Sequence, residues 1–545
     1  SSDSLSVTHR GNTTTTLTLN NEETLTIDSS TAAATISTLN AADVTSLTIT
    51  GDEDLTITTL AGNLNLATVD ASASTGTVST GTSNASTTAT TFTAGSGGLT
   101  SEGTTQADTF VGGAGADAFD GNGGADSATG AGGADDLDGG AGNDTLDGGA
   151  GADTLVSGAG NDSLTGGAGN DTMTLSTNYT VLDAIDGGDG TDTVTATITD
   201  TALTPVWTNV ETATIVAGNG GAASAITMSS TAVTTLNLTG AADNDIVTFT
   251  DLASGATVNI GDANIDPILD TVAGGSITVE ADAVNDESVS VTDAATVTAK
   301  AGVNSGAFGS LALDNTDTTS LTVTSASATF DIDTNVLSNT DALTSITLST
   351  TGASAADGNV VVGTIADIDN LTSLTYNASG GDITSEAIGA TGTGEKLATI
   401  DIDAADGATL TIATITMDTT DSAVGVAENA LTFTIDSDSS SDVNIADFNN
   451  QYGTVTGTLA GAGVIDFTTG TSTIAGEAVT LTLSGSGAKT IDEIDPSGNV
   501  SITSTTTGAV TITDLQAAGA TKTVTIDASG ATGAHTINAD HTGNV

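Results

Sequence analysis

Aspartate recurs at every ninth residue over one stretch of the chain, and this spacing has the clearest chemistry in the sequence. Eight acids keep the register without a break: Asp108, Asp117, Asp126, Asp135, Asp144, Asp153, Asp162 and Asp171. Carboxylate oxygens suit hard cations, and Ca²⁺ takes about six to eight oxygen ligands, whereas Mg²⁺ demands a tighter octahedron. If two nine-residue units form one coil, alternate acids stack about 4.8 Å apart and repel each other unless a cation lies between them. The spacing therefore predicts calcium sites along both edges of the coils.

Glycine stands at fixed positions between these acids, where it permits turns that a residue with a Cβ resists. The backbone carbonyls of such turns are further ligands for a hard cation. The glycines predicted to contribute are Gly112, Gly115, Gly139, Gly142, Gly148, Gly151, Gly166 and Gly169. Two residues after each acid comes Phe110, Phe119, Ala128, Leu137, Leu146, Leu155, Leu164 or Met173. We expect these side chains to point inward from short strands and to form the core.

The unit Gly-Gly-Ala-Gly-Ala-Asp-Ala-Phe-Asp at residues 112–120 resembles the GGxGxDxUx nonapeptide of the repeats-in-toxin (RTX) family. The same pattern restarts at Gly121, Gly130, Gly139, Gly148, Ser157 and Gly166. The resemblance implies a parallel β-roll that binds several Ca²⁺ ions, and we expect about six, one between each stacked pair of turns. The turns at 121–124 and 130–133 depart from the pattern and are expected to hold calcium more weakly.

Beyond Thr174 the nine-residue register is lost, although residues 186–194 look like a detached final turn of the same kind. This turn adds Asp189 and Asp192 to the predicted metal ligands. The strand expected after it, residues 209–215, resembles one that often follows RTX arrays in large secreted proteins.

The flanks of the array alternate apolar and polar residues in short segments, which is typical of half-buried strands. One segment pattern recurs at residues 45–49, 319–323, 344–348 and 372–376. The sequence predicts an all-β chain, with a parallel β-roll flanked by β-solenoid or serial β-sandwich segments, and the alternation does not choose between the two. We divide the chain into residues 1–100, 101–195, 196–350 and 351–545. Residues 70–100, rich in Ser, Thr, Ala and Gly, are expected to be a loosely patterned stretch or linker.

Composition narrows the classes of function. The 545 residues carry 68 acidic and 5 basic side chains, for a formal net charge of −63, and no cysteine. Such a surface repels phosphate backbones and anionic lipids, so we expect no nucleic-acid partner, and cations are the natural partners. The lack of cysteine removes disulfides and thiolate metal sites. No apolar run approaches the length of a membrane span, and the first residues show no signal peptide.

Catalytic motifs are missing, which argues against an enzyme. The three histidines, His9, His535 and His541, do not lie in HExxH, and no GxSxG occurs. Further acid clusters stand at 401–406 and 436–442; in turns such residues often bind only local N–H groups, although some are expected to hold extra calcium.

A long, cysteine-free, acidic β protein with an embedded calcium roll resembles the calcium-dependent surface-layer (S-layer) proteins of Gram-negative bacteria, which leave the cell by type I secretion. The resemblance implies a structural extracellular protein at the cell surface that folds and self-assembles with Ca²⁺ into a lattice. It also implies contact with cell-surface polysaccharide or lipopolysaccharide. A calcium-dependent adhesin or a biofilm-matrix filament subunit is the alternative, because it would use the same secretion and the same β architecture.

Overall fold

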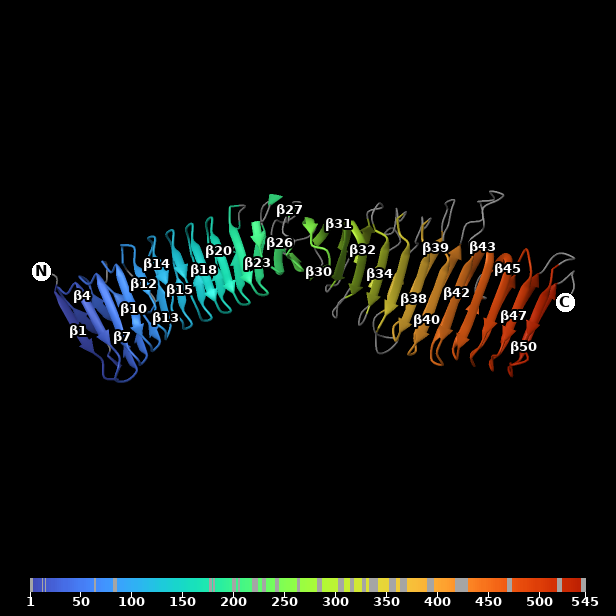
Figure 1. The fold of residues 1–545 in the computed structure, drawn as a ribbon, viewed down its shortest axis with the longest axis horizontal. Helices are drawn as coiled ribbons and strands as arrows, with labels where there is room; N and C mark the ends of the chain where they lie inside the picture. The colour runs from blue at the N-terminus through green and yellow to red at the C-terminus, as the bar shows by residue number, and fades with distance from the viewer. Residues whose placement is uncertain are drawn as a thin grey trace. The chain divides into compact units, whose positions relative to one another are not determined.

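The chain winds into parallel β-solenoid coils (Figure 1). The computed structural model describes residues 3–11, 13–14, 16–62, 65–81, 86–175, 179, 182–198, 202–203, 206–217, 224–227, 232–240, 245–261, 265–281, 287–301, 308–313, 318–325, 330–332, 342–351, 359–362, 370–389, 397–416, 430–467, 473–516 and 522–540. Every regular element within these ranges is a β-strand. The chain divides into two compact units, Ser1–Asp245 and Ile246–Val545.

In the first unit, one sheet is a continuous parallel stack of eleven strands. They are β1 (Ser4–Thr8), β4 (Thr24–Asp28), β7 (Ser46–Gly51), β10 (Thr68–Ser74), β12 (Thr91–Thr93), β14 (Thr109–Val111), β16 (Ser127–Thr129), β18 (Thr145–Ala150), β20 (Ser163–Ala168), β22 (Ala184–Asp189) and β25 (Val206–Thr208). Each strand pairs with its counterparts in the coils before and after it, so the sheet grows along the solenoid.

The opposite wall of the first unit is a second parallel stack. It contains β2 (Thr13–Thr14), β5 (Ala34–Ile36), β8 (Leu55–Ile57), β11 (Val78–Ser79), β13 (Leu99–Glu102), β15 (Ala118–Asp120), β17 (Asp136–Asp138), β19 (Thr154–Val156), β21 (Thr172–Leu175), β23 (Thr193–Ile198), β26 (Thr212–Ala217) and β28 (Thr235–Gly240), with β24 (Ala202–Leu203) and β27 (Ser224–Thr227) paired beside it. A short third sheet, β3 (Leu17–Leu19), β6 (Leu39–Ala41) and β9 (Leu60–Ala61), widens the first coils.

Coil length falls to its minimum in the array of repeated acids. In the first sheet Leu25 pairs with Leu47, which lies 22 residues further on, whereas Phe110 pairs with Ala128, 18 residues on. Two nonapeptides therefore form one coil, as the period predicts. The eight predicted inward residues all lie at 3% exposure or less, which confirms them as the core of this region.

The stretch 70–100 is not a linker. It contains β11, β12, β13 and part of β10, and β12 pairs directly with β14, the first strand after the first repeated acid. Its small side chains are buried, as at Ala71 and Ala94, and hydroxyls satisfy backbone groups, as where Thr90 Oγ1 donates to the Leu66 carbonyl at 2.8 Å. The prediction failed because Ser and Thr here serve as ordered hydrogen-bonding groups. The flank and the array consequently form one solenoid.

The second unit has the same architecture. One wall contains β30 (Ala256–Ile260), β34 (Ser320–Ser325), β36 (Ser345–Thr350), β38 (Ser373–Ser379), β40 (Thr399–Ala405), β42 (Leu431–Ser437), β47 (Val500–Ser504) and β49 (Val524–Asp527). The other contains β33 (Phe308–Leu313), β35 (Phe330–Ile332), β37 (Val360–Val362), β39 (Ile383–Gly389), β41 (Thr409–Thr416), β44 (Val464–Phe467), β46 (Lys489–Ile494), β48 (Val510–Gln516) and β50 (His535–Asp540). Four long strands contribute to both walls: β31 (Ile265–Ala281), β32 (Glu287–Ala301), β43 (Asp442–Gly461) and β45 (Thr473–Leu483). The remaining strand, β29 (Asp245–Leu252), lies at the boundary of the units.

Three of the recurring segments, 319–323, 344–348 and 372–376, lie in successive coils of one wall of the second unit, whereas 45–49 lies in β7 of the first unit. Leu321 pairs with Ile346, and Ile346 pairs with Leu374, all in parallel register. The threonine that begins a segment donates its hydroxyl to the coil before it: Thr344 Oγ1 lies 2.9 Å from the Thr319 carbonyl oxygen, and Thr372 Oγ1 lies 2.9 Å from the Thr344 carbonyl oxygen. The parallel pairing identifies the described flanks as a solenoid and not as sandwiches. The alternation of apolar and polar residues in the sequence could not distinguish the two.

Candidate metal centre

Each repeated acid stands immediately before a short strand and points back under the preceding coil. The eight acids are buried, with at most 2% of their surface exposed. The glycine-rich turn before each acid brings the chain around the edge of the roll, and the strand after it buries the apolar residue. Burial of so many carboxylates requires partners, because an unpaired charge in this environment is costly.

One oxygen of each carboxylate binds the backbone of the coil before it. The N–H of Asp108 donates to Asp126 Oδ1 at 2.6 Å, and the N–H of Asp126 donates to Asp144 Oδ1 at 2.7 Å. This pattern produces two acid ladders. The first ladder is Asp108, Asp126, Asp144, Asp162 and Asp183; the second is Asp117, Asp135, Asp153, Asp171, Asp192 and Glu211.

The last members of both ladders were missed in the sequence. Asp162 N–H donates to Asp183 Oδ1 at 2.6 Å, and Asp192 N–H donates to Glu211 Oε2 at 2.8 Å. Neither Asp183 nor Glu211 follows a Gly-Gly turn, so the nonapeptide pattern does not include them. One sequence feature could have identified Asp183 as a ladder member: it stands two residues before the buried Ile185, as each repeated acid stands two residues before a buried apolar residue.

The other carboxylate oxygen lacks a hydrogen-bond donor in most of these acids. Six buried Oδ2 atoms have no hydrogen-bond partner, those of Asp126, Asp135, Asp144, Asp153, Asp171 and Asp192. They lie against the first glycine of their own repeat, together with a carbonyl of the next coil. A Cβ on Gly121 would lie 2.5 Å from both Asp126 Oδ2 and the Gly139 carbonyl oxygen. Two oxygens thus converge beside each such glycine, which fits the donor set of Ca²⁺.

The predicted glycines fall into two groups. Gly112, Gly139, Gly148 and Gly166 face the carboxylate of their own repeat, and a Cβ would lie 2.5 to 2.8 Å from its Oδ2. Gly115, Gly142, Gly151 and Gly169 lie against the backbone of the coil before them. Gly169 also has a φ of +141°, which a residue with a Cβ rarely adopts. Gly139, Gly148 and Gly166 of the first group lie beside carboxylates with an unpartnered oxygen, and the second group permits the coils to stack.

Comparison with known families agrees with this geometry. Residues 102–137, 129–164 and 147–176 match the family described as RTX calcium-binding nonapeptide repeat (4 copies). This array is an RTX calcium-binding repeat region. Its cofactor is Ca²⁺, bound in several copies. No curated protein and no solved structure matches the chain.

Electrostatics show why the RTX array needs the ion. Burial, followed by repulsion from Asp144 and Asp108, raises the pKa of Asp126 to about 7, although the Asp108 N–H opposes the shift. Burial and neighbouring ladder acids also raise the pKa of Asp135 and of Asp162 to about 6 each. Calcium bound beside these carboxylates would replace the missing solvation and cancel the repulsion between them.

Side chains alone do not complete a coordination shell in the RTX array. Among the residues that the structure describes, no group of three or more Asp, Glu or His could hold a metal ion. Each ion must therefore draw on backbone carbonyls, such as that of Gly139 beside Asp126. Asp189 lies outside both ladders and is exposed, and its carbonyl accepts the Gly169 N–H at 2.8 Å. Its predicted role as a ligand stays a prediction.

Two described histidines contact a hydroxyl group: His9 Nε2 lies 3.1 Å from Thr14 Oγ1, and His535 contacts a serine. His535 Nε2 lies 2.9 Å from Ser504 Oγ, and His535 Nδ1 lies 2.9 Å from the Gly533 carbonyl. Ser504 is 1% exposed and faces the interior of its coil, so a substrate has no access to the hydroxyl. His541 falls outside the described residues. The described part of the chain also contains no apolar helix of membrane-spanning length.

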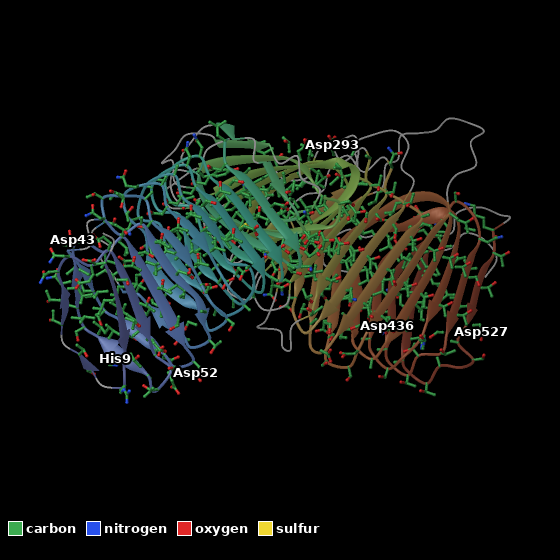
Figure 2. The ribbon with its side chains drawn as sticks, turned by 60° about the vertical axis from the view of Figure 1, so that its left-hand side comes forward. His9, Asp43, Asp52, Asp293, Asp436 and Asp527 are labelled. Atoms are coloured by element: carbon green, nitrogen blue, oxygen red, sulfur yellow. The ribbon has the colours of Figure 1, made fainter. Side chains whose placement is uncertain are left out.

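The acid clusters of the second unit bind backbone groups. Asp406 N–H donates to Asp438 Oδ2 at 2.8 Å, and Ser440 N–H donates to Asp438 Oδ1 at 2.8 Å. Hydrogen bonds, chiefly from Ser441, hold the pKa of Asp438 well below its usual range. Asp403 and Asp436 pair in register on an exposed face, and burial, followed by repulsion from Asp436, raises the pKa of Asp403. Figure 2 shows Asp436 and Asp527 on the outer side of their strands.

Proposed function

We propose that this protein is a secreted structural protein that folds with Ca²⁺ outside the cell and self-assembles into a surface layer. The observation that carries the proposal is the set of six buried carboxylate oxygens without a partner. At low calcium these charges oppose folding, and at high calcium the ion-binding free energy becomes folding free energy. RTX repeats are typical of secreted proteins, and such a switch would weaken the folding of the RTX array before export.

The composition of the outer faces of the sheets favours assembly over catalysis. They carry threonine, serine and exposed acids such as Asp401 and Asp403, and the chain as a whole has a formal net charge of −63. Copies of this charge repel each other unless cations bridge them, so calcium would control association as well as folding. Regular, flat parallel sheets of this kind offer extended surfaces for a second copy of the chain. Cell-surface polysaccharide or lipopolysaccharide is the partner we propose for attachment.

Electron microscopy of the purified chain, with millimolar Ca²⁺ and after chelation, tests the proposal. Ordered sheets that dissolve on chelation are expected. Calcium-dependent fibres would favour a filament subunit or adhesin, and dispersed folded particles in both conditions would contradict assembly.

A matched variant separates folding from association. Asp401→Asn, Asp403→Asn and Asp436→Asn together remove exposed acids outside the RTX array, so the variant should keep the circular dichroism of the parent in calcium. We expect the calcium concentration needed for sheets to change while that needed for folding does not. If both shift together, calcium acts on assembly only through folding.

A further inference from the structure

The first two repeated acids differ from the later ones in how their carboxylates are satisfied. Asp108 Oδ1 accepts the Thr90 N–H at 2.5 Å, and its Oδ2 accepts the Thr104 N–H at 2.6 Å and the Thr104 hydroxyl at 2.9 Å. Asp117 Oδ1 accepts the Leu99 N–H at 2.6 Å, and its Oδ2 accepts the Gly113 N–H at 2.7 Å. Both oxygens of each acid are therefore occupied by donors from the protein.

The cause lies in the second residue of each repeat. In the first two repeats this residue, Thr104 or Gly113, has no positive φ, and its N–H points to the carboxylate; we call this a closed turn. In the later repeats it has a positive φ, which we call an open turn. The residues of the open turns are Asn122 (+61°), Ala131 (+70°), Gly140 (+81°), Gly149 (+97°), Gly158 (+83°), Gly167 (+109°) and Gly188 (+97°).

An open turn takes the N–H away from the ladder acid. The Asn122 N–H donates instead to Asp120 Oδ1 at 2.9 Å, and the Gly140 N–H donates to Asp138 Oδ1 at 3.0 Å. All six carboxylates with an unpartnered buried Oδ2 follow an open turn. The turn conformation thus separates the two acids whose Oδ2 accepts a backbone N–H from the six whose Oδ2 has no partner.

We propose that Asp108 and Asp117 are not calcium ligands but metal-free attachments of the RTX array to the preceding coils, and that calcium binding begins at Asp126. Their donors Thr90 and Leu99 belong to the flanking coils, so these two acids join the array to a part of the solenoid that carries no repeated acids. Thr104 favours the closed turn because a β-branched residue resists positive φ. Phe92, Phe110 and Phe119 pack beneath this junction, with ring centroids 5.0 and 5.8 Å apart for the pairs that include Phe119. The flank then presents the array with a preformed edge on which calcium-dependent coils stack.

Isosteric variants distinguish the two kinds of acid. Asp126→Asn should reduce the number of calcium ions bound by the full chain. It should also raise the calcium concentration needed for folding by about tenfold or more, as expected when a metal site loses a supporting carboxylate. In calcium-free buffer the same variant should be more resistant to urea, because a buried charge without a partner is removed.

Asp108→Asn should keep the calcium stoichiometry of the parent. It should lower the urea midpoint equally with and without calcium, because its amide would face the Thr104 N–H donor in both conditions. Binding is measured by equilibrium dialysis with ⁴⁵Ca²⁺, and stability by urea titration of the fluorescence of Trp207. If Asp108→Asn does not fold, Asp117→Asn gives the same readout.

Loss of calcium by Asp108→Asn or Asp117→Asn to the extent seen for Asp126→Asn would overturn the assignment. The inference rests on calcium binding by the array but not on assembly. A parent chain that binds calcium yet forms no lattice would contradict the proposed function and leave this assignment standing.

Discussion

Acidification is expected to stabilise the calcium-free RTX array, because protons can replace calcium at the ladder acids. The pKa of Asp126 is raised from 3.8 to about 7, and those of Asp135 and Asp162 are raised to about 6. For an acid with a raised pKa in the folded state, the penalty is full above that pKa and is relieved as the pH falls through it. The destabilisation by ionised Asp126 therefore begins to fall near pH 7 and is lost near pH 3.8, the pKa of the acid in the unfolded chain.

The size of the effect follows from these shifts. At about 1.4 kcal/mol per pKa unit, Asp126 contributes about 4 kcal/mol, and Asp135 and Asp162 about 3 kcal/mol each. Asp126 and Asp162 share the neighbour Asp144, so their contributions overlap; with Asp162 not counted separately, the combined gain between pH 7.5 and pH 4 is about 7 kcal/mol.

The assay is urea unfolding of chain stripped of calcium on a chelating resin, followed by circular dichroism and Trp207 fluorescence at several pH values. Trp207 is the only tryptophan, is 2% exposed, and packs against Tyr179 in the coil after the array. With millimolar calcium the trend should reverse, since protons compete with the ion. A calcium-free stability that falls or stays constant from pH 7.5 to pH 5 would refute the reasoning. The triple variant Asp126→Asn, Asp135→Asn and Asp162→Asn should lose most of the dependence, which separates the ladders from the general relief of net charge.

Three further changes test the packing of the coils by urea unfolding in calcium. Gly148→Ala should lower the free energy of unfolding by more than about 2 kcal/mol and weaken calcium binding, because its Cβ would lie 2.5 Å from a ladder carboxylate. The control, Gly123→Ala, meets nothing closer than 3.4 Å and should lower the free energy of unfolding by less than about 1 kcal/mol. Ala131→Gly should raise stability by about 0.5–1 kcal/mol, since Ala131 holds a φ of +70° that glycine adopts without strain; a loss would show that the strain is absent. Lys489→Met should destabilise by about 2–4 kcal/mol, because the fully buried ammonium donates to three backbone carbonyls, while Lys522→Met should have little effect; equal effects would contradict this role.

The nine-residue period was sufficient to predict the array, because it fixes which residues share an edge. A coil of 18 residues places Asp126 on Asp108 and Asp144, and Leu146 on Ala128, with no information from elsewhere in the chain. The recurring segments at 345 and 373 were likewise sufficient to indicate that they share an architecture.

The remaining features depend on contacts between coils, which local patterns do not encode. Alternation of period two is the same in a sandwich and in a solenoid, so the parallel pairing of Leu321 with Ile346 was not predictable. The role of Asp108 depends on donors at Thr90 and Thr104, which lie in different coils of the solenoid. Glu211 lies 19 residues after Asp192, so the 18-residue spacing of the array does not predict it as a ladder member.

Polar groups at the edges of the coils need partners, and they obtain them in three ways. A turn at a solenoid edge leaves polar backbone groups and packed oxygens that must be satisfied. In the recurring flank segments threonine hydroxyls such as that of Thr344 bind the carbonyl of the coil before them, and at one edge of the second unit the ammonium of Lys489 binds three carbonyls. The open turns of the RTX array place six carboxylate oxygens at the edge without a donor from the described part of the chain. We therefore expect calcium dependence to be a local property of these turns, because the coils on which they stack are satisfied by donors of the chain itself.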